Sequence, residues 1–202
     1  MKKTATTSYP IHELLAERWS PRAFADRPVD VQTLGSLFEA ARWAASCFNE
    51  QPWHYLVATR EDAAGFESLA SSLMDGNAWA KNAPVLVLAV ANTKFVRNDK
   101  PNRHALHDLG LATGNLSVQA QSMGLVLHQM GGFDPEAARA AAGIPADCDP
   151  VAMIAIGYPG DASSLPEALA EREAAPRERK ALSSFVFGAT WGEAPATPLS
   201  DS

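Results

Sequence analysis

Two arginines flank a serine in the short segment Arg18-Trp19-Ser20-Pro21-Arg22. A guanidinium presents a planar fork of donors that matches the oxygens of a phosphate, and a serine hydroxyl adds a neutral donor. Pro21 opposes a continuing helix, so the segment is predicted to be a turn. Alone, the turn is consistent with a phosphate site but is more typical of solvated charges.

A polar loop precedes an aromatic residue in the segment from Ser46 to Trp53. Ser46, Asn49 and Gln51 offer directional donors and acceptors, and Pro52 with Trp53 adds a rigid aromatic plate. Such a loop can bind a ligand. It is also consistent with a turn that leads into a strand, with Trp53 in the core.

Two later features could also contribute to a binding site. Gly131 and Gly132 follow a predicted strand, and glycine lets the backbone approach a flat ligand closely, although a tight turn is the simpler reading. Residues 177–180, Arg-Glu-Arg-Lys, are either a solvated face or the second half of a phosphate clamp. The sequence contains no GxGxxG or GxxxxGK pattern, so a Rossmann or P-loop nucleotide site is not indicated.

His104 and His107 stand three residues apart in a predicted helix, a spacing that allows them to share a metal. No third ligand with matching spacing accompanies them. They are therefore interpreted as surface histidines, with Asp108 as a buried or capping carboxylate, and no metal site is predicted. Cys47 and Cys148 lie far apart and form neither a disulfide framework nor a zinc pattern, which favours a reducing cytoplasm.

Hydrophobic periodicity predicts the elements that must position these residues. Apolar residues three and four apart, with Asp30 as a cap, predict a helix that runs up to the polar loop. Leu106 is expected on the inner face of the longest helix, and Leu14 and Leu15 on the inner side of the first. Four strands spaced among helices, without a clean βαβ repeat, indicate an α+β layered domain. The predicted strands are 53–59, 84–91, 125–130 and 151–158, and the other predicted helices are 10–17, 62–74, 102–123 and 135–142.

The bulk composition fits one globular domain: 202 residues, 47% hydrophobic, with a formal net charge of −6. This charge argues against a non-specific nucleic-acid-binding protein, which needs a basic face. No apolar run is long enough to cross a membrane, and residues 1–10 do not read as a secretory signal, so a cytoplasmic protein is expected. In the tail, residues 185–191 are apolar enough that they are expected to dock on another surface.

Taken in order, these features resemble the nitroreductase family of FMN-dependent oxidoreductases over nearly the whole chain. The family opens with an Arg-(Arg or His)-Ser-x-Arg turn, which residues 18–22 resemble. Its Ala-Pro-Ser-x-x-Asn-x-Gln-Pro-Trp loop resembles residues 44–53, and this match is the most specific one. The resemblance implies a three-layer α/β/α fold of the α+β class with a central mixed, largely antiparallel sheet, formed by residues 1–202 as one domain.

The resemblance also implies FMN bound between two identical subunits, with about residues 161–202 wrapping the partner. Arg18 and Ser20 would hold the FMN phosphate, together with Arg177 or Arg179 from the tail. Arg22 would lie near the pyrimidine end of the ring, where a fixed cation favours the reduced flavin. The other implied cofactor residues are Ser46, Cys47 and Asn49 from the partner subunit, Asn77 near the ring or ribityl chain, Gly131 and Gly132 near N5, and Trp19, Gln51 and Met130.

The chemistry implied is hydride transfer from NADH or NADPH, through the flavin, to a small electron-poor acceptor such as a nitroaromatic, a quinone or an enone, in a ping-pong cycle. Because the flavin N5 does this chemistry, no catalytic side chain is expected. Two alternatives stay open: a flavin carrier or sensor without turnover, and a specialised reductase of the same fold, such as a dehalogenase or a 3-oxo-acid reductase. Trp19, where Arg or His is common, and Cys47, where a small residue is usual, depart from the family pattern.

Overall fold

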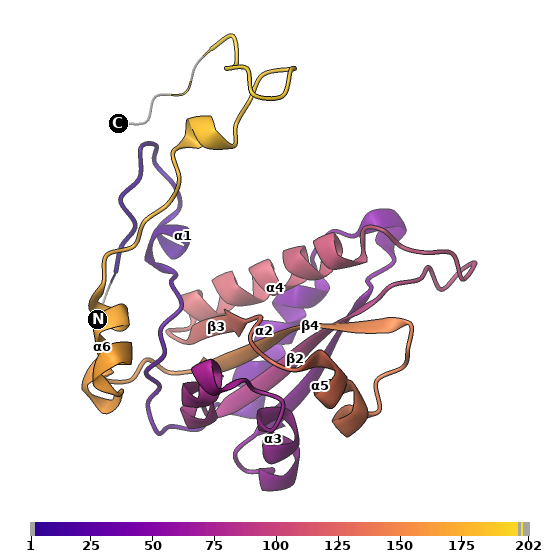
Figure 1. The fold of residues 1–202 in the computed structure, drawn as a ribbon, viewed down its shortest axis with the longest axis vertical. Coiled ribbons are helices and arrows are strands. Elements are labelled where there is room, and N and C mark those ends of the chain that lie inside the picture. The colour runs from indigo at the N-terminus through magenta and orange to yellow at the C-terminus, as the bar shows by residue number, and fades with distance from the viewer. Residues whose placement is uncertain (1–2, 198, 200–202) are drawn as a thin grey trace.

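A four-stranded sheet forms the centre of the computed structural model, which describes residues 3–197 and 199 (Figure 1). The strand order is β1-β2-β4-β3, and each neighbouring pair is antiparallel. The predicted antiparallel character is therefore confirmed, and none of the described strand pairs is parallel. The strands are β1 (Trp53–Thr59), β2 (Val85–Asn92), β3 (Val126–Met130) and β4 (Cys148–Gly157).

Helices cover both faces of this sheet, which gives the predicted three layers (Figure 1). On one face, α2 (Val31–Arg42) and α4 (Ala105–Ser122) enclose a core that includes Leu37, Leu116 and Ile154. These three side chains are fully buried. Because β2 is covered on both faces, it reads in the sequence as a continuous apolar run with no alternation.

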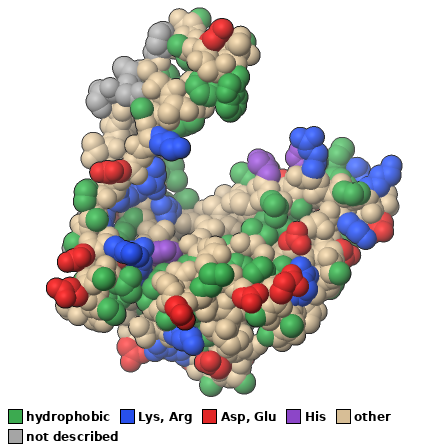
Figure 2. Space-filling model, in the orientation of Figure 1, with side chains coloured by type: hydrophobic (Ala, Val, Ile, Leu, Met, Phe, Trp, Pro, Cys, Tyr) green, Lys and Arg blue, Asp and Glu red, His purple; other side chains and the backbone are tan. Residues whose placement is uncertain are grey.

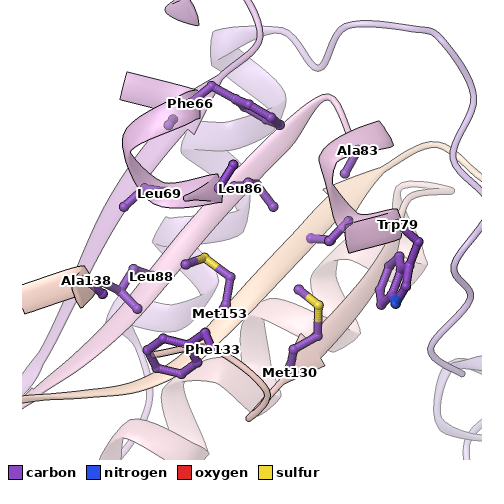
Figure 3. Packing of buried hydrophobic residues seen from close by; sticks show 14 of the residues in the cluster. Phe66, Leu69, Trp79, Ala83, Leu86, Leu88, Met130, Phe133, Ala138 and Met153 are labelled. Atoms are coloured by element: carbon purple, nitrogen blue, oxygen red, sulfur yellow. The ribbon is translucent and has the colours of Figure 1, made fainter. Parts of the chain in front are cut away.

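The other face carries α3 (Ala63–Ala70), α5 (Pro135–Ala142) and the 3-10 segment η2 (Asp75–Asn82). Figure 3 shows the core between these elements and the sheet, where Trp79 of η2 and Met130 of β3 pack into the same cluster. This second core is important for the site because η2 and the end of β3 hold several of the predicted cofactor residues.

Helix ends lie where the sequence supplies caps. Asp30 Oδ1 accepts the N–H of Thr33 at 2.8 Å at the start of α2. Asp134 Oδ1 accepts two N–H groups at 3.0 Å at the start of α5, and Gly143, with φ 64°, ends that helix in the left-handed region. These local signals explain why both helix starts are predicted correctly.

Three details of the helix predictions are wrong. The helix predicted over residues 62–74 ends at Ala70, and Leu73 instead forms a bridge with Phe133. The first helix, α1, spans only Glu13–Glu17 and buries no residue, and Leu15 is 49% exposed. Leu106 is 55% exposed. The buried stripe of α4 runs through Ala105, Asp108 and Leu109, and Leu106 lies about 100° around the helix from Ala105.

The two chain ends together form an arm that projects from the body (Figure 1). The N–H of Ala5 donates to the carbonyl of Ala16 at 2.8 Å, and Arg177 donates to the same carbonyl at 2.7 Å. Helix α6 (Glu167–Ala174), which the sequence does not predict, lies at the foot of the arm. Farther along, Trp191 is 90% exposed, so the apolar tail finds little cover on the described chain.

Among the described residues, no helix combines the length and the apolar character needed to cross a bilayer.

Candidate functional site

Basic side chains line a cavity of about 200 Å³ at the foot of the arm. Figure 2 shows Lys and Arg side chains gathered on the lower part of the arm, beside the hollow between arm and body. The lining includes no Asp or Glu. Six of the predicted cofactor residues are brought together in this lining: Arg18, Trp19, Ser20, Arg22, Arg177 and Arg179. The other basic lining residues are Lys3 and Arg172, which belong to none of the sequence motifs described above.

The guanidinium groups in this cavity repel one another. Arg18 donates through Nη1 to Ser20 Oγ at 3.5 Å, which aims both groups at the same space. Burial lowers the pKa of Arg18, and the positive charges of Arg177 and Arg179 lower it further. A group of cations that disfavour one another's charged state is stabilised by a bound anion. The charge of the lining therefore suits the cavity to an anion.

One aromatic ring and one lysine close the cavity toward the N-terminus. Lys3 Nζ lies 4.7 Å from the centre of the Trp19 ring, a cation–π geometry. The same ammonium donates to the carbonyl oxygens of Glu173 and Ala175. Trp19 therefore does not reduce the number of cations in the cavity, because it positions Lys3 there.

A buried carboxylate binds the far side of residues 18–22, which we call the arginine turn. Glu173 is 2% exposed, and its Oε1 accepts the N–H of Arg22 at 2.9 Å and the N–H of Ala23 at 3.3 Å. Its Oε2 lies 3.6 Å from Nη1 of Arg22. Glu173 thus fixes both the backbone of the turn and one of its two arginines.

Behind Arg22, two rings in tilted contact, Trp79 and His128, connect the anion cavity to the second core. The guanidinium carbon of Arg22 lies 5.9 Å from the centre of the Trp79 ring, and the His128 ring lies 4.6 Å from Trp79. His128 Nδ1 lies 2.9 Å from the carbonyl oxygen of Pro21. Because a carbonyl only accepts, we assign the proton of His128 to Nδ1. Burial lowers the pKa of His128, so this ring is neutral near pH 7.

The glycine pair after β3 is fixed by Asn77. Asn77 Nδ2 donates to the carbonyl of Gly132 at 2.9 Å, and the N–H of Met74 donates to the same oxygen at 3.1 Å. A Cβ on Gly132 would lie 2.5 Å from Asn77 Nδ2, so any other residue here would displace the Asn77 amide from this hydrogen bond. Gly131 has no such neighbour and is exposed. Met130 is 4% exposed, and its side chain packs into the second core (Figure 3).

The polar loop after α2 has an unusual backbone. Three of its non-glycine residues have positive φ: Phe48 at 54°, Asn49 at 56° and Gln51 at 51°. Such angles cost energy outside glycine and persist where neighbouring groups hold them. Ser46 Oγ accepts the N–H of Gln51 at 3.0 Å, and Asp108 Oδ2 accepts the N–H of Cys47 at 2.9 Å. Asp108 is 2% exposed, which confirms its predicted role as a buried carboxylate.

We expect Asp108→Ala to lower the free energy of unfolding by about 2 kcal/mol, because the Cys47 N–H loses its acceptor in a partly buried place. Urea unfolding would measure this loss. Asp108→Asn keeps an oxygen that can accept the same N–H and should cost less than half as much. Equal losses in the two variants would contradict the hydrogen-bond explanation.

The polar loop and the arginine turn lie at opposite ends of α4. Cys47 contacts Asp108 in the first turn of α4, whereas Trp19 lines a cavity together with Gln121 in the last turn. Asp108 and Gln121 are thirteen positions apart along the helix, which corresponds to about 20 Å. One chain therefore holds these two groups of predicted cofactor residues apart, and Asn77, Met130, Gly131 and Gly132 form a third group at the end of β3. We define the anion half-site as the residues that line the basic cavity of about 200 Å³ at the foot of the arm. We define the loop half-site as residues 46–51.

Comparisons with known proteins agree with this architecture. A protein of Mycolicibacterium smegmatis, described as an uncharacterized 15.4 kDa protein in the ask 5′ region, is 40% identical over 136 residues, covering 66% of this chain and 90% of that protein. A protein of Archaeoglobus fulgidus, named provisionally as an NADH dehydrogenase/NAD(P)H nitroreductase, is 26% identical over 160 residues, covering 77% of this chain and 89% of that protein. A solved structure described as an oxidoreductase containing FMN is similar with a TM-score of 0.86 and 35% identity, covering 92% of this chain and 95% of that chain.

The three-layer fold and the cation-lined cavity, together with these relatives, define an oxidoreductase enzyme of the α+β class. The chain belongs to the nitroreductase family, whose family model matches residues 15–78 and 64–158. The predicted family, fold class and enzyme class are therefore confirmed. The names of the relatives also agree with the predicted cofactors, FMN and NAD(P)H.

Proposed function

We propose that two copies of this chain bind FMN between them and use it to pass hydride from NADH or NADPH to small electron-poor organic acceptors. The observation that carries the proposal is the excess positive charge of the anion half-site. A phosphate monoester carries about one and a half to two negative charges and three acceptor oxygens. The spacing of these oxygens matches the two parallel donors of a guanidinium group. Arg18, Ser20, Arg177 and Arg179 would hold this phosphate.

The rest of the anion half-site would position the ring system. When bound, FMN supplies the hydride-accepting and hydride-donating chemistry at its N5. Arg22 contributes a cation whose place is fixed by Glu173, and it would lie toward the pyrimidine end of the ring. The exposed Gly131 leaves room for a flat ligand beside the backbone, while Asn77 holds the neighbouring Gly132 in place. In this arrangement Asn77 is a positioning residue for the glycine pair.

The separation of the two half-sites supports a homodimer. The loop half-site, with Ser46, Cys47, Asn49 and Gln51, lies about 20 Å of helix away from the anion half-site of its own chain. A two-fold pairing would place the loop half-site of one chain beside the anion half-site of the other and build two equivalent flavin sites. The exposed rings of Phe185 and Trp191 would gain cover if the tail, within about residues 161–202, wraps the partner.

Each step of the reaction would use the same face of the ring. The reduced nicotinamide would bind first, give up its hydride and leave, and the acceptor would then take its place, which is a ping-pong cycle. Acceptors of this kind are electron-poor and flat, as nitroaromatics, quinones and enones are. The residues that line the anion half-site orient the cofactor, and no step requires a nucleophile or a general base from them.

The proposal predicts that the purified protein is yellow and carries one FMN for each chain. Under anaerobic conditions, NADH or NADPH should bleach the yellow colour, and a nitroaromatic or a quinone should restore it. Absorbance near the flavin maximum would follow both half-reactions. A protein that stays colourless after incubation with FMN would rule out the proposed function, and a yellow protein that nicotinamide does not bleach would rule out the oxidoreductase cycle.

A further inference from the structure

A short hairpin packs on the loop half-site. Lys94 and Pro101 form an antiparallel bridge, and the N–H of Phe95 donates to the carbonyl of Lys100 at 2.8 Å. The N–H of Val96 donates to Glu50 Oε1 at 2.6 Å, which joins the hairpin to the polar loop. We define residues 94–101 as the basic hairpin.

At its tip, the basic hairpin displays a guanidinium supported by two aromatic rings. The guanidinium carbon of Arg97 lies 4.2 Å from the centre of the Phe48 ring and 5.2 Å from the centre of the Phe95 ring. The two rings meet edge to face at 6.1 Å. Phe48 is 72% exposed and Val96 is 82% exposed, so the whole group faces outward. Ring stacking holds the cation in place without neutralising it.

The hairpin is also basic within an acidic protein. Four of the ten residues from 94 to 103 are Lys or Arg and only Asp99 is acidic, whereas the whole chain has a formal net charge of −6. Lys94 pairs with Asp99 at 3.1 Å. Among the ion pairs of the described chain, none includes Arg97, Lys100 or Arg103. Exposed cations concentrated in this way attract an anionic ligand.

The proposed reaction has one substrate that is a strong anion. The acceptors are small and need no charge, whereas NADH carries a pyrophosphate and NADPH carries one phosphate more. Since the loop half-site would meet the flavin of the partner chain, the basic hairpin would lie at the rim of that flavin site. Arg97, at the tip of the hairpin, would then offer its planar guanidinium to the part of a dinucleotide that extends beyond the flavin ring.

We propose that the basic hairpin binds the phosphate groups of the nicotinamide dinucleotide, with Arg97 as the main contact and Lys100 as a second one. This inference rests on the proposed function, because it assigns a substrate to the flavin site. It makes residues 94–101 the element that distinguishes the dinucleotide donor from a bare dihydronicotinamide ring.

The test compares donors with and without phosphate, using the FMN-loaded protein. Anaerobic stopped-flow reduction would be followed with NADH, with NADPH and with an N-benzyl dihydronicotinamide, which has no phosphate. Arg97→Ala should raise the half-saturating concentration of both dinucleotides about tenfold, with little change in the limiting rate, and leave the rate with the phosphate-free donor unchanged. Arg97→Lys, which keeps the charge, should show a smaller rise, and added salt should weaken dinucleotide binding more in the wild type than in Arg97→Ala.

A matched control is Arg27→Ala, which removes another exposed arginine stacked on a ring, 3.7 Å from the centre of Tyr158 and outside both half-sites. It should leave all three donors unaffected. Unchanged half-saturation in Arg97→Ala would overturn the proposal, and so would an equal loss with the phosphate-free donor. Lys100→Ala should change the same quantities in the same direction.

Calorimetric binding of NADP⁺, which has no hydride to give to the oxidised flavin, separates this inference from the proposed function. If the wild-type flavin is not reduced by any donor, the proposed cycle fails. Salt-sensitive NADP⁺ binding that Arg97→Ala weakens about tenfold would still support the hairpin site. NADP⁺ binding that is the same in the wild type and in Arg97→Ala would overturn it.

Discussion

Replacement of Arg18 by alanine is expected to weaken FMN binding by about 2 kcal/mol or more, which corresponds to roughly 30-fold in Kd. Arg18 is half-buried within the cation group, and its Nη1 lies 3.5 Å from Ser20 Oγ. A phosphate bound here would make charge-assisted contacts in a place where water screens them poorly. The loss should therefore exceed the effect of removing an exposed charge.

Fluorescence titration of the flavin-free protein would measure the Kd. Without flavin, the Arg18→Ala protein should resist urea at least as well as the wild type, because the substitution removes the repulsion between Arg18 and the cations Arg177 and Arg179. Arg18→Lys keeps a charge but loses the fork, and it should fall between the two proteins. An Arg18→Ala protein that binds FMN as tightly as the wild type would remove Arg18 from the phosphate site.

The sheet could be predicted from the sequence because its strands carry strong local signals. Trp53–Thr59 is predicted with its observed bounds, and the buried run of β2 is predicted to within one residue at each end. The α5 helix is equally well marked, since Asp134, Pro135 and Gly143 stand at its ends. The tail helix α6 has no side-chain cap. It also buries only Glu173, so its sequence shows no apolar stripe that would indicate a helix.

The parts of the site that are continuous in sequence were also predictable. Residues 18–22 and 44–53 each form a compact motif, and the structure places the first of them in the anion half-site. Lys3 and Glu173 could not be predicted in the same way. They reach the turn only through contacts between distant parts of the chain, and a lone Lys or Glu in a polar segment resembles any surface charge.

The backbone conformation of the loop half-site could not be predicted from the sequence. Asn49 is of a type that adopts the left-handed region more readily than most, but the residue types of Phe48 and Gln51 do not indicate positive φ angles. Those angles depend on Asp108, which stands far along the chain on α4. The same holds for Gly132, because its close contact with Asn77 could not be distinguished in the sequence from an ordinary tight turn.

Removal of the Glu173 carboxylate is expected to have the largest effect on stability. Glu173→Ala should lower the free energy of unfolding by about 3 kcal/mol, because it leaves the N–H groups of Arg22 and Ala23 without their acceptor and leaves Arg22 without its carboxylate. Urea unfolding of the flavin-free protein is the appropriate measurement, since bound FMN would add its own stabilisation.

Glu173→Gln separates the structural role of this residue from its charge. The amide keeps an oxygen that can accept the backbone N–H groups, so the stability loss should be about half of that in Glu173→Ala. It also removes the negative charge that partly neutralises Arg22, so the anion half-site becomes more positive and FMN should bind at least as tightly as in the wild type. Lower stability with undiminished FMN affinity is a combination that no loss of folding would produce. If Glu173→Gln instead lost FMN as severely as Arg18→Ala, Glu173 would act mainly by orienting Arg22 toward the ligand, and the electrostatic explanation would be wrong.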